Sequence, residues 1–147
     1  MHHSRKRYSP YTPEQLFALV GDVERYPQFL PWLSSLRTWN PRFESEGVEL
    51  LDAEAEVRFA VIREKFSSRV RRDRPAMTID VNLISGPFRK LQNQWRFRPH
   101  PGGSELTFDI DFEFGSRFLE GMFAANFPKA VVSIIKRFEA RATELYG

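Results

Sequence analysis

Cysteine is absent from the 147 residues of this sequence. A chain without cysteine has no disulfide bridge, no thiolate nucleophile and no cysteine-bound metal, and it suits a reducing compartment. The sequence also lacks a run of about 18 apolar residues, which a membrane-spanning helix requires. The basic residues near the N-terminus are not followed by an apolar segment, so we expect no secretory signal there.

Histidine is scarce, and its scarcity excludes several kinds of catalytic site. Apart from His2 and His3, to which we assign no role, the chain contains only His100. This residue belongs to a predicted hairpin turn, where histidine is far more often structural than catalytic. We expect neither a Ser-His-Asp triad nor a zinc site built on histidine. A glycine-rich phosphate loop and a dinucleotide fingerprint are also missing from the sequence.

The acidic residues offer no better catalyst. Asp109, Asp111 and Glu113 alternate with an apolar row along a predicted strand, so we interpret them as solvated charge on its outer face. Asp22 and Glu24 are better explained as the start of a helix than as a general acid and base. We therefore predict a protein that is not an enzyme and has no catalytic residues, metal ligands or cofactor.

Aromatic residues, by contrast, are abundant. The chain has fourteen Phe, three Trp and four Tyr. A buried Phe needs no hydrogen-bond partner, so it lines a packed core and an apolar cavity equally well. Composition alone leaves both alternatives open.

Positive charge is concentrated in one stretch, although the net charge is only +3. Seven Lys and Arg residues lie between positions 58 and 74, against two acidic residues. One interpretation is a solvated outer face of a sheet. The other is a contact surface for anionic lipid headgroups or RNA phosphates. The candidate contacts are Lys65, Arg69, Arg71, Arg72 and Arg74.

Two short helices are predicted near the N-terminus. Thr12 is a suitable N-cap, Pro13 a first helical residue and Gln15 the partner that completes a capping box. We expect this helix to end at Gly21. Asp22 is then expected to cap a second short helix, which the following prolines end.

The segment after Asp22 gathers large apolar side chains on a short, stiff stretch of backbone. Such a segment is typical of a lid over a cavity, although an ordinary place in the core remains an equal alternative. Its candidate ligand-binding residues are Tyr26, Phe29, Leu30, Pro31 and Trp32.

Strands joined by turns are predicted for residues 4–9 and for residues 36–114. Apolar and polar residues alternate with a period of two, most regularly at 106–114. The turn at 100–103, with proline and two glycines, is the strongest hairpin signal. Hairpin-linked strands of this kind form an antiparallel sheet with one buried face.

The C-terminal residues 116–146 predict a long amphipathic helix, with apolar residues recurring every three or four positions. Pro128 lies within it and removes a helical hydrogen bond, so we expect a kink or a restart there. Asn126 is suited to cap the second segment. Otherwise it is an unpaired polar group on the apolar side, which needs a water or a ligand oxygen.

These elements together predict an α+β protein with the order β-α-α-β6-α. A curved antiparallel sheet would wrap round one long C-terminal helix, in a single domain covering residues 1–147. Such a sheet often leaves a gap at one end of the helix. The residues expected to line it are Phe59, Trp95, Phe114, Phe118, Met122, Asn126 and Phe127.

Beginning at residues 22–32 (DVERYPQFLPW), the sequence resembles the coenzyme Q-binding START-type family of the polyketide cyclase/dehydrase and lipid transport superfamily. The likeness continues at residues 64–70, 86–97, 111–114 and 137–142, so it covers nearly the whole chain in order. It implies a helix-grip fold and the binding of a ubiquinone-type isoprenoid quinone without catalysis. Ribosome-association toxins, thought to bind the large ribosomal subunit, are similar to it as well.

Three functions therefore stay open from the sequence. The first is a quinone or polyprenyl lipid chaperone that supports respiratory electron transport, and we expect it in the cytoplasm of a bacterium or at the surface of the inner membrane. The second is a ribosome-binding protein of the toxin type. The third is an aromatase or cyclase, which an acid–base pair would have to support.

Overall fold

A computed structural model describes residues 1–59 and 62–147, with the side chains of Phe59, Ile62 and Phe123 outside the description. Its strands form one antiparallel sheet with the order β1-β7-β6-β5-β4-β3-β2. The strands are β1 (His2–Ser9), β2 (Leu33–Ser45), β3 (Val48–Phe59), β4 (Ile62–Asp73), β5 (Thr78–Ser85), β6 (Phe88–His100) and β7 (Gly103–Phe114). The helices are α1 (Pro13–Gly21), the 3-10 helix η1 (Val23–Gln28), α2 (Arg117–Phe123), the 3-10 turn η2 (Ala124–Asn126) and α3 (Phe127–Tyr146).

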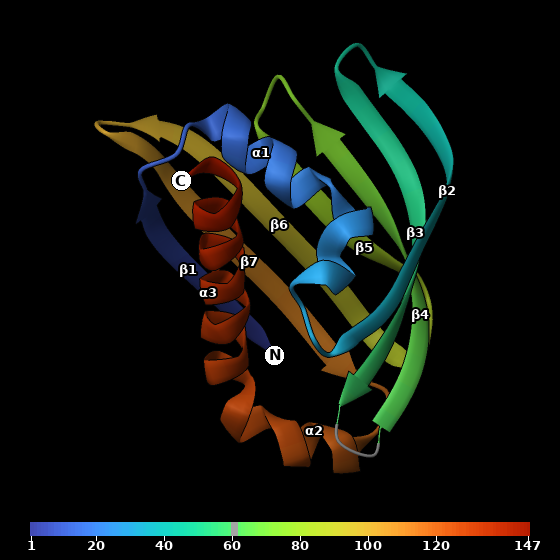
Figure 1. The fold of residues 1–147 in the computed structure, drawn as a ribbon. Helices are drawn as coiled ribbons and strands as arrows, with labels where there is room; N and C mark the ends of the chain where they lie inside the picture. Colours follow the sequence, from blue (N-terminus) through green and yellow to red (C-terminus); the bar gives the residue numbers. More distant parts are fainter. Residues whose placement is uncertain (60–61) are drawn as a thin grey trace.

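The sheet is curved, and the helices lie on its concave side (Figure 1). Helix α3 runs along the sheet near β1 and β7, while α1 lies across β5 and β6 and η1 contacts β2. Helix α2 lies at the other end of the sheet and is turned away from the axis of α3. The predicted order β-α-α-β6-α and the wrapped, helix-grip architecture are confirmed.

The start of α1 follows the local sequence closely. The backbone N–H of Gln15 donates to Oγ1 of Thr12 at 3.1 Å, and the backbone N–H of Thr12 donates to Oε1 of Gln15 at 2.9 Å. This reciprocal pair is the predicted capping box. The prediction for Asp22 is wrong, because its side chain makes no cap hydrogen bond to η1. Its carboxylate instead pairs with Nε of Arg25 at 2.9 Å.

The C-terminal helical region is not one helix. It begins with α2, capped by the Ser116 side chain, and continues through η2 before α3 starts at Phe127. The expected restart at Pro128 is therefore found, one residue early. Asn126 is exposed and its side chain caps nothing, which corrects that expectation. One contribution comes from Pro128, two residues after Asn126, which has no backbone N–H to donate to a cap.

Two glycines allow the chain to close tightly at the α2 end of the sheet. At Gly86, which has φ +151°, an added Cβ would lie 2.6 Å from Cβ of Phe66. At Gly115 it would lie 2.2 Å from the carbonyl oxygen of Pro87. The turn between β5 and β6 is thus held against β4 and against the end of β7, which brings Phe88 beside Phe66.

The most deeply buried residues lie under α1, η1 and the C-terminal part of α3. The buried face of α3 consists of Val131, Ile135, Phe138 and Ala142, none more than 5% exposed. Opposite them are Trp95 and Phe97 of β6 and Phe108 of β7, which are 2–3% exposed. We call this part of the concave side the closed half; it comprises Trp95, Phe97, Phe108 and Phe138 with the apolar residues of α1.

Candidate functional site

The other end of the concave side carries a group of phenylalanines that are only half-buried. They come from β4, from the start of β6, from the end of β7 and from the first residue of α3. We call them the aromatic surface, and they form the open half of the concave side: Phe66, Phe88, Phe112, Phe114 and Phe127.

These rings contact one another across strands that are far apart in sequence. The Phe88 ring centroid lies 5.2 Å from that of Phe66 and 4.8 Å from that of Phe112. Phe112 also meets Phe114 at 4.7 Å and stacks on Phe127 at 6.4 Å. The register between β6 and β7 pairs Phe88 with Phe114, which places both at the same end of the sheet. The result is a continuous apolar surface that the helices leave partly uncovered.

The closed half leaves little room for a ligand. Trp95 packs against Phe108 at 4.6 Å and Phe138 at 4.8 Å between ring centroids. A cavity of about 20 Å³ lies beside these residues. A cavity of that size holds no more than a water molecule. Trp95, predicted as part of a ligand-binding wall, therefore belongs to the packed core in this structure.

The predicted lid residues pack mainly on α3. The rings of Tyr26 and Phe29 meet the ring of Phe138 at 5.1 Å and 5.0 Å, both edge-on. Leu30 is 5% exposed, whereas Pro31 is exposed. Trp32 is half-buried, and the guanidinium of Arg137 lies 5.5 Å from its ring. The segment thus covers the middle of the concave side, and the rings of Tyr26 and Phe29 are partly buried and pack against the core.

Tyr26 anchors this segment from inside. Its hydroxyl donates a hydrogen bond to the carbonyl oxygen of Val20, near the end of α1. Burial raises the pKa of the Tyr26 phenol far above its ordinary value, and the negative charge of Asp22 adds to the rise. The phenol is therefore neutral in the physiological range and serves as a hydrogen-bond donor.

Helix α2 places its predicted pocket residues differently from expectation. Phe118 is 75% exposed and Met122 is 51% exposed, so neither lines the inside of the sheet in this structure. The reason is the break at η2, which turns α2 away from the stripe that α3 continues. Phe127, after the break, does face the aromatic surface. The side chain of Phe59, another predicted wall residue, lies outside the described part of the chain.

One polar residue at the aromatic surface was missed. His3 lies in β1 opposite Ile110, and its ring meets Phe127 edge-on at 6.4 Å. Within the described residues its Nε2 is buried and has no hydrogen-bond partner. Leaving such a group unpaired typically costs about 1–3 kcal/mol. The alternation of the first strand carries the signal, but the predicted strand begins at Ser4 and so leaves His3 out.

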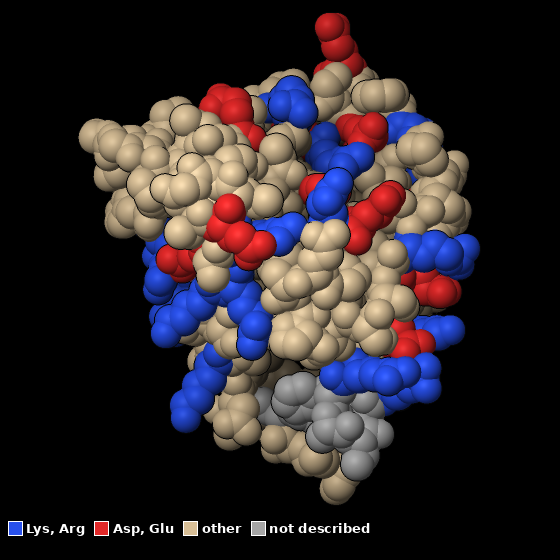
Figure 2. All heavy atoms as spheres, viewed as in Figure 1, with Lys and Arg blue, Asp and Glu red and all other residues tan. Residues whose placement is uncertain are grey.

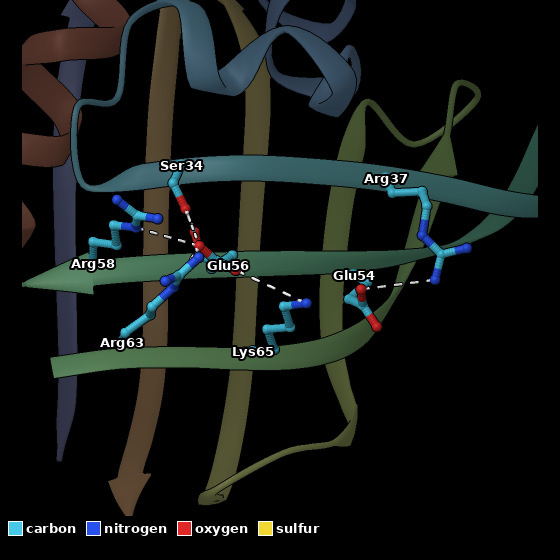
Figure 3. A network of polar contacts seen from close by, with 7 residues as sticks. All are labelled: Ser34, Arg37, Glu54, Glu56, Arg58, Arg63 and Lys65. Carbon is cyan, nitrogen blue, oxygen red and sulfur yellow. Dashed lines mark hydrogen bonds and ion pairs between the residues drawn. The ribbon is translucent and has the colours of Figure 1, made fainter.

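The convex side of the sheet is polar and densely paired, as Figure 3 shows for one part of it. Glu56 of β3 is only 7% exposed, because basic side chains of β3 and β4 cover it. Its Oε1 accepts hydrogen bonds from Ser34 at 2.9 Å, Arg63 at 3.0 Å and Arg58 at 3.3 Å. The hydrogen bond from Ser34, with that from Arg63, holds the pKa of Glu56 below its usual value. Lys65 completes the group, with Nζ 3.9 Å from Oε2.

The remaining predicted contact residues are Arg69, Arg71 and Arg72 of β4 and Arg74 just after it, and they divide between the two sides of the sheet. Arg69 and Arg71 are on the convex side, each paired with carboxylates, of which Glu44 lies 2.7 Å from Nε of Arg71. Arg72 is on the concave side, where its Nη1 donates to the carbonyl oxygen of Gly21 at 2.8 Å. Arg74 stacks over the ring of Phe17 at 4.9 Å. The expectation of one outer basic face is therefore wrong for Arg72 and Arg74.

A different group of basic residues has no acidic partner among the described residues. Arg5 of β1 and Lys129, Lys136 and Arg137 of α3 line a shallow groove of about 600 Å³ on the outside of α3. Figure 2 shows Lys and Arg side chains gathered over α3 at the lower left of the view. These four residues form what we call the α3 basic groove, which the sequence had not singled out.

Comparison with known proteins identifies the family. The profile for polyketide cyclase / dehydrase and lipid transport matches residues 9–139. The ribosome association toxin RatA of Rickettsia prowazekii is 38% identical over 139 residues, covering 92% of each chain. The mitochondrial coenzyme Q-binding protein COQ10 homolog B of Xenopus laevis is 27% identical over 150 residues, covering 99% of this chain and 59% of that protein.

Solved structures agree on the fold. The solution structure of the 18 kDa protein CC1736 from Caulobacter crescentus matches with a TM-score of 0.83 and 49% identity, covering 100% and 99% of the two chains. The Zhui aromatase/cyclase from Streptomyces sp. R1128 matches with a TM-score of 0.77 at 15% identity, covering 97% and 93%. The second likeness, at 15% identity, shows only that the fold is shared. No helix in the described parts of the chain combines the length and hydropathy needed to cross a bilayer.

Proposed function

This chain belongs to the polyketide cyclase / dehydrase and lipid transport family, and we propose that it binds a ubiquinone-type isoprenoid quinone on the aromatic surface without catalysing a reaction. The observation that carries the proposal is the set of five half-buried phenylalanines facing one another at the open half. Apolar surface left partly in water gains free energy when a ligand covers it. A flat quinone ring and an isoprenoid tail suit stacked and edge-on rings.

A role in binding rather than in catalysis is supported by the names of the relatives. One is named for association with ribosomes and one for binding coenzyme Q. The aromatase alternative has the name of the family, polyketide cyclase / dehydrase and lipid transport, and a structural likeness at 15% identity that reaches no further than the fold. We therefore propose a carrier that holds the quinone, and supports respiratory electron transport by doing so.

The first test is to purify the protein from a quinone-producing bacterium and to quantify the co-purifying lipid by organic extraction and mass spectrometry. The Phe112→Gln variant places an amide in the middle of the aromatic surface and should lower the bound quinone several-fold, since an unpaired polar group would lie against the ligand. Phe43→Gln is the matched control, because Phe43 is 72% exposed and remote from this surface. Equal quinone in the two variants would overturn the proposed site.

We propose that the carrier meets its ligand at the surface of the inner membrane through α2. Phe118 and Met122 are one helical turn apart and exposed, and Arg117 beside them is exposed too. Apolar groups of this kind enter the headgroup region, while each nearby basic residue adds about 1 kcal/mol on an anionic leaflet. The fraction of protein that floats with vesicles containing anionic lipid should fall when Phe118 and Met122 are both changed to Ser. Unchanged flotation would contradict this contact.

Association with ribosomes is the second candidate, and a specific observation favours it. A relative that is 38% identical is named a ribosome association toxin, and the α3 basic groove offers Arg5, Lys129 and Lys136 without acidic partners in the described chain. Binding through phosphates would fall steeply with salt. The previously expected contacts Lys65, Arg69 and Arg71 are already engaged by carboxylates.

Those two sets of residues make a matched test for ribosome binding. Co-sedimentation with large ribosomal subunits should be lost when Arg5, Lys129 and Lys136 are all changed to Ser. The control changes Lys65, Arg69 and Arg71 to Ser, which removes the same number of charges from paired positions. If the control variant alone lost binding, the contact would be on the convex side. Binding unchanged in both would count against the ribosome proposal.

A further inference from the structure

The imidazole of His3 is a polar group at the edge of the aromatic surface. Antiparallel pairing of β1 with β7 sets His3 opposite Ile110 on the concave side. The backbone N–H of Phe112 donates to the carbonyl oxygen of Met1 at 2.8 Å, so the strand is held on both sides of His3. The ring of His3 stands edge-on to Phe127, which itself stacks on Phe112. This imidazole is therefore positioned by packing rather than free to rotate into solvent.

The neighbouring histidine of the same strand, His2, has an ordinary partner for its ring nitrogen. His2 points to the convex side, where its Nε2 lies 2.9 Å from a carboxylate oxygen of Asp109. His3 points to the concave side, and its buried Nε2 has no hydrogen-bond partner within the described residues. Buried polar atoms in folded proteins are paired in the large majority of cases. An unpaired one beside an incompletely covered apolar surface marks the place where a ligand atom would complete the pair.

The chemistry of an imidazole N–H narrows the identity of that atom. With its hydrogen on Nε2, the imidazole donates one hydrogen bond, so its partner is an acceptor. A ring carbonyl oxygen is an acceptor of this kind, and it is attached to a flat ring that can pack on Phe127 and Phe112. The apolar tail of the same molecule would then follow the phenylalanines towards α2.

We propose that Nε2 of His3 donates a hydrogen bond to a ring carbonyl oxygen of the quinone, and that this bond makes the surface selective for quinones over lipids without such an acceptor. The inference rests on the proposed function, because it assigns a residue and a specificity to the same surface. His3 is then a binding residue that recognises the head of the ligand, while the phenylalanines hold the ring and the tail.

The test compares two probes that carry the same tail and differ at the ring carbonyls. One is decylubiquinone, and the other is its fully methylated hydroquinone, in which both ring carbonyls are replaced by methyl ethers. Binding is measured by quenching of tryptophan fluorescence and confirmed by calorimetry. The wild-type protein should bind decylubiquinone about tenfold more tightly than the methyl ether, the difference expected for one hydrogen bond.

Three variants separate recognition from packing. His3→Leu replaces the imidazole by an apolar side chain of similar size and should lose about tenfold in affinity for the quinone but not for the methyl ether. His3→Gln restores an N–H donor and should recover part of that loss. His2→Leu changes the same residue type on the opposite side of the strand and should leave both affinities unchanged. Thermal unfolding of His3→Leu should occur no earlier than that of the wild type, because the variant removes an unpaired buried group.

The outcomes distinguish this inference from the function on which it rests. If the wild-type protein binds neither probe, the quinone proposal fails, and the inference with it. If the wild type binds both probes equally and His3→Leu changes nothing, quinone binding stands and the role of His3 is overturned. Equal loss of both probes in His3→Leu also overturns it, since His3 would then be a packing residue.

Discussion

The closed half and the open half of the concave side are built from the same kind of residue on the same strands. Trp95 and Phe108 in the closed half are 2–3% exposed, whereas Phe88 and Phe112 on the same two strands, β6 and β7, are half-buried. The difference lies in what covers them. Helix α1, η1 and the later turns of α3 cover the closed half, while the open half has only the first turn of α3 and the turned-away α2.

This difference separates stability from binding within one sheet. Complete burial of a large apolar side chain contributes about 1.5–3 kcal/mol, and the closed half has realised that gain in the folded protein. The half-buried rings have realised only a part of it. The remainder is available to a ligand that covers them, which is why the open half is the better candidate for the functional site.

The largest expected effect tests the difference in packing between the two halves, by removing one aromatic ring from each. Phe138→Ala should lower the free energy of unfolding by about 3–5 kcal/mol, because Phe138 meets Tyr26, Phe29 and Trp95 in the packed core. Phe112→Ala should cost about half as much, since part of its surface is already in water. Urea unfolding followed by far-UV circular dichroism measures both values.

Equal destabilisation by the two variants would mean that the open half is packed as tightly as the closed half. In that case the aromatic surface would be an ordinary core, and the case for a ligand there would be lost. A small effect of Phe138→Ala would contradict the assignment of the closed half in the same way.

A second prediction concerns how the open half is held together. Gly86→Ala should cost about 1–3 kcal/mol, because a side chain at φ +151° is strained and its Cβ would lie 2.6 Å from Cβ of Phe66. The same change should move Phe66 away from Phe88 and weaken quinone binding. Gly121→Ala in α2 is the control: a Cβ there meets nothing within 4 Å, and alanine favours a helix. If the two variants are equally stable in thermal unfolding, the close approach at Gly86 does not constrain this end of the sheet.

The sequence alone predicted much of the fold and little of this contrast between the halves. Regular alternation predicted the strands, and the capping box at Thr12 was found as expected. The alternation is the same at Phe108 and Phe112, so it could not show which of them a helix would cover. That depends on the direction of α2 before the break at η2, which is decided by tertiary packing rather than by the local pattern.

Some of what was missed could have been found from the same alternation. Arg72 follows Phe66, Ser68 and Val70 at steps of two, so the pattern already placed it on the concave side. His3 would have been placed there too, had the first strand been extended by two residues to His2. The pairing of Glu56 with four partners was not accessible in this way, because it depends on the register of β2, β3 and β4.

The smallest expected effect comes from the convex side behind the open half, at Glu56. The pKa of this carboxyl is lowered in the folded protein, first by the hydrogen bond from Ser34 and then by that from Arg63. A lowered pKa means that the folded state binds the proton less readily than the unfolded chain. The stabilisation from Glu56 is therefore complete above the ordinary glutamate pKa of about 4.3 and is lost as the pH falls through the lower, folded-state value. Glu56→Gln should accordingly reduce stability slightly at neutral pH and make unfolding less sensitive to acid below about pH 4. Urea unfolding of both proteins across that range measures the difference.

Because Ser34, Glu56 and Arg63 join β2, β3 and β4 behind Phe66, hydrogen exchange in the Glu56→Gln variant should rise in those strands before it rises around Trp95. Uniform exchange would show instead that the two halves unfold as one unit. Their difference in exposure would then reflect only which helices cover them.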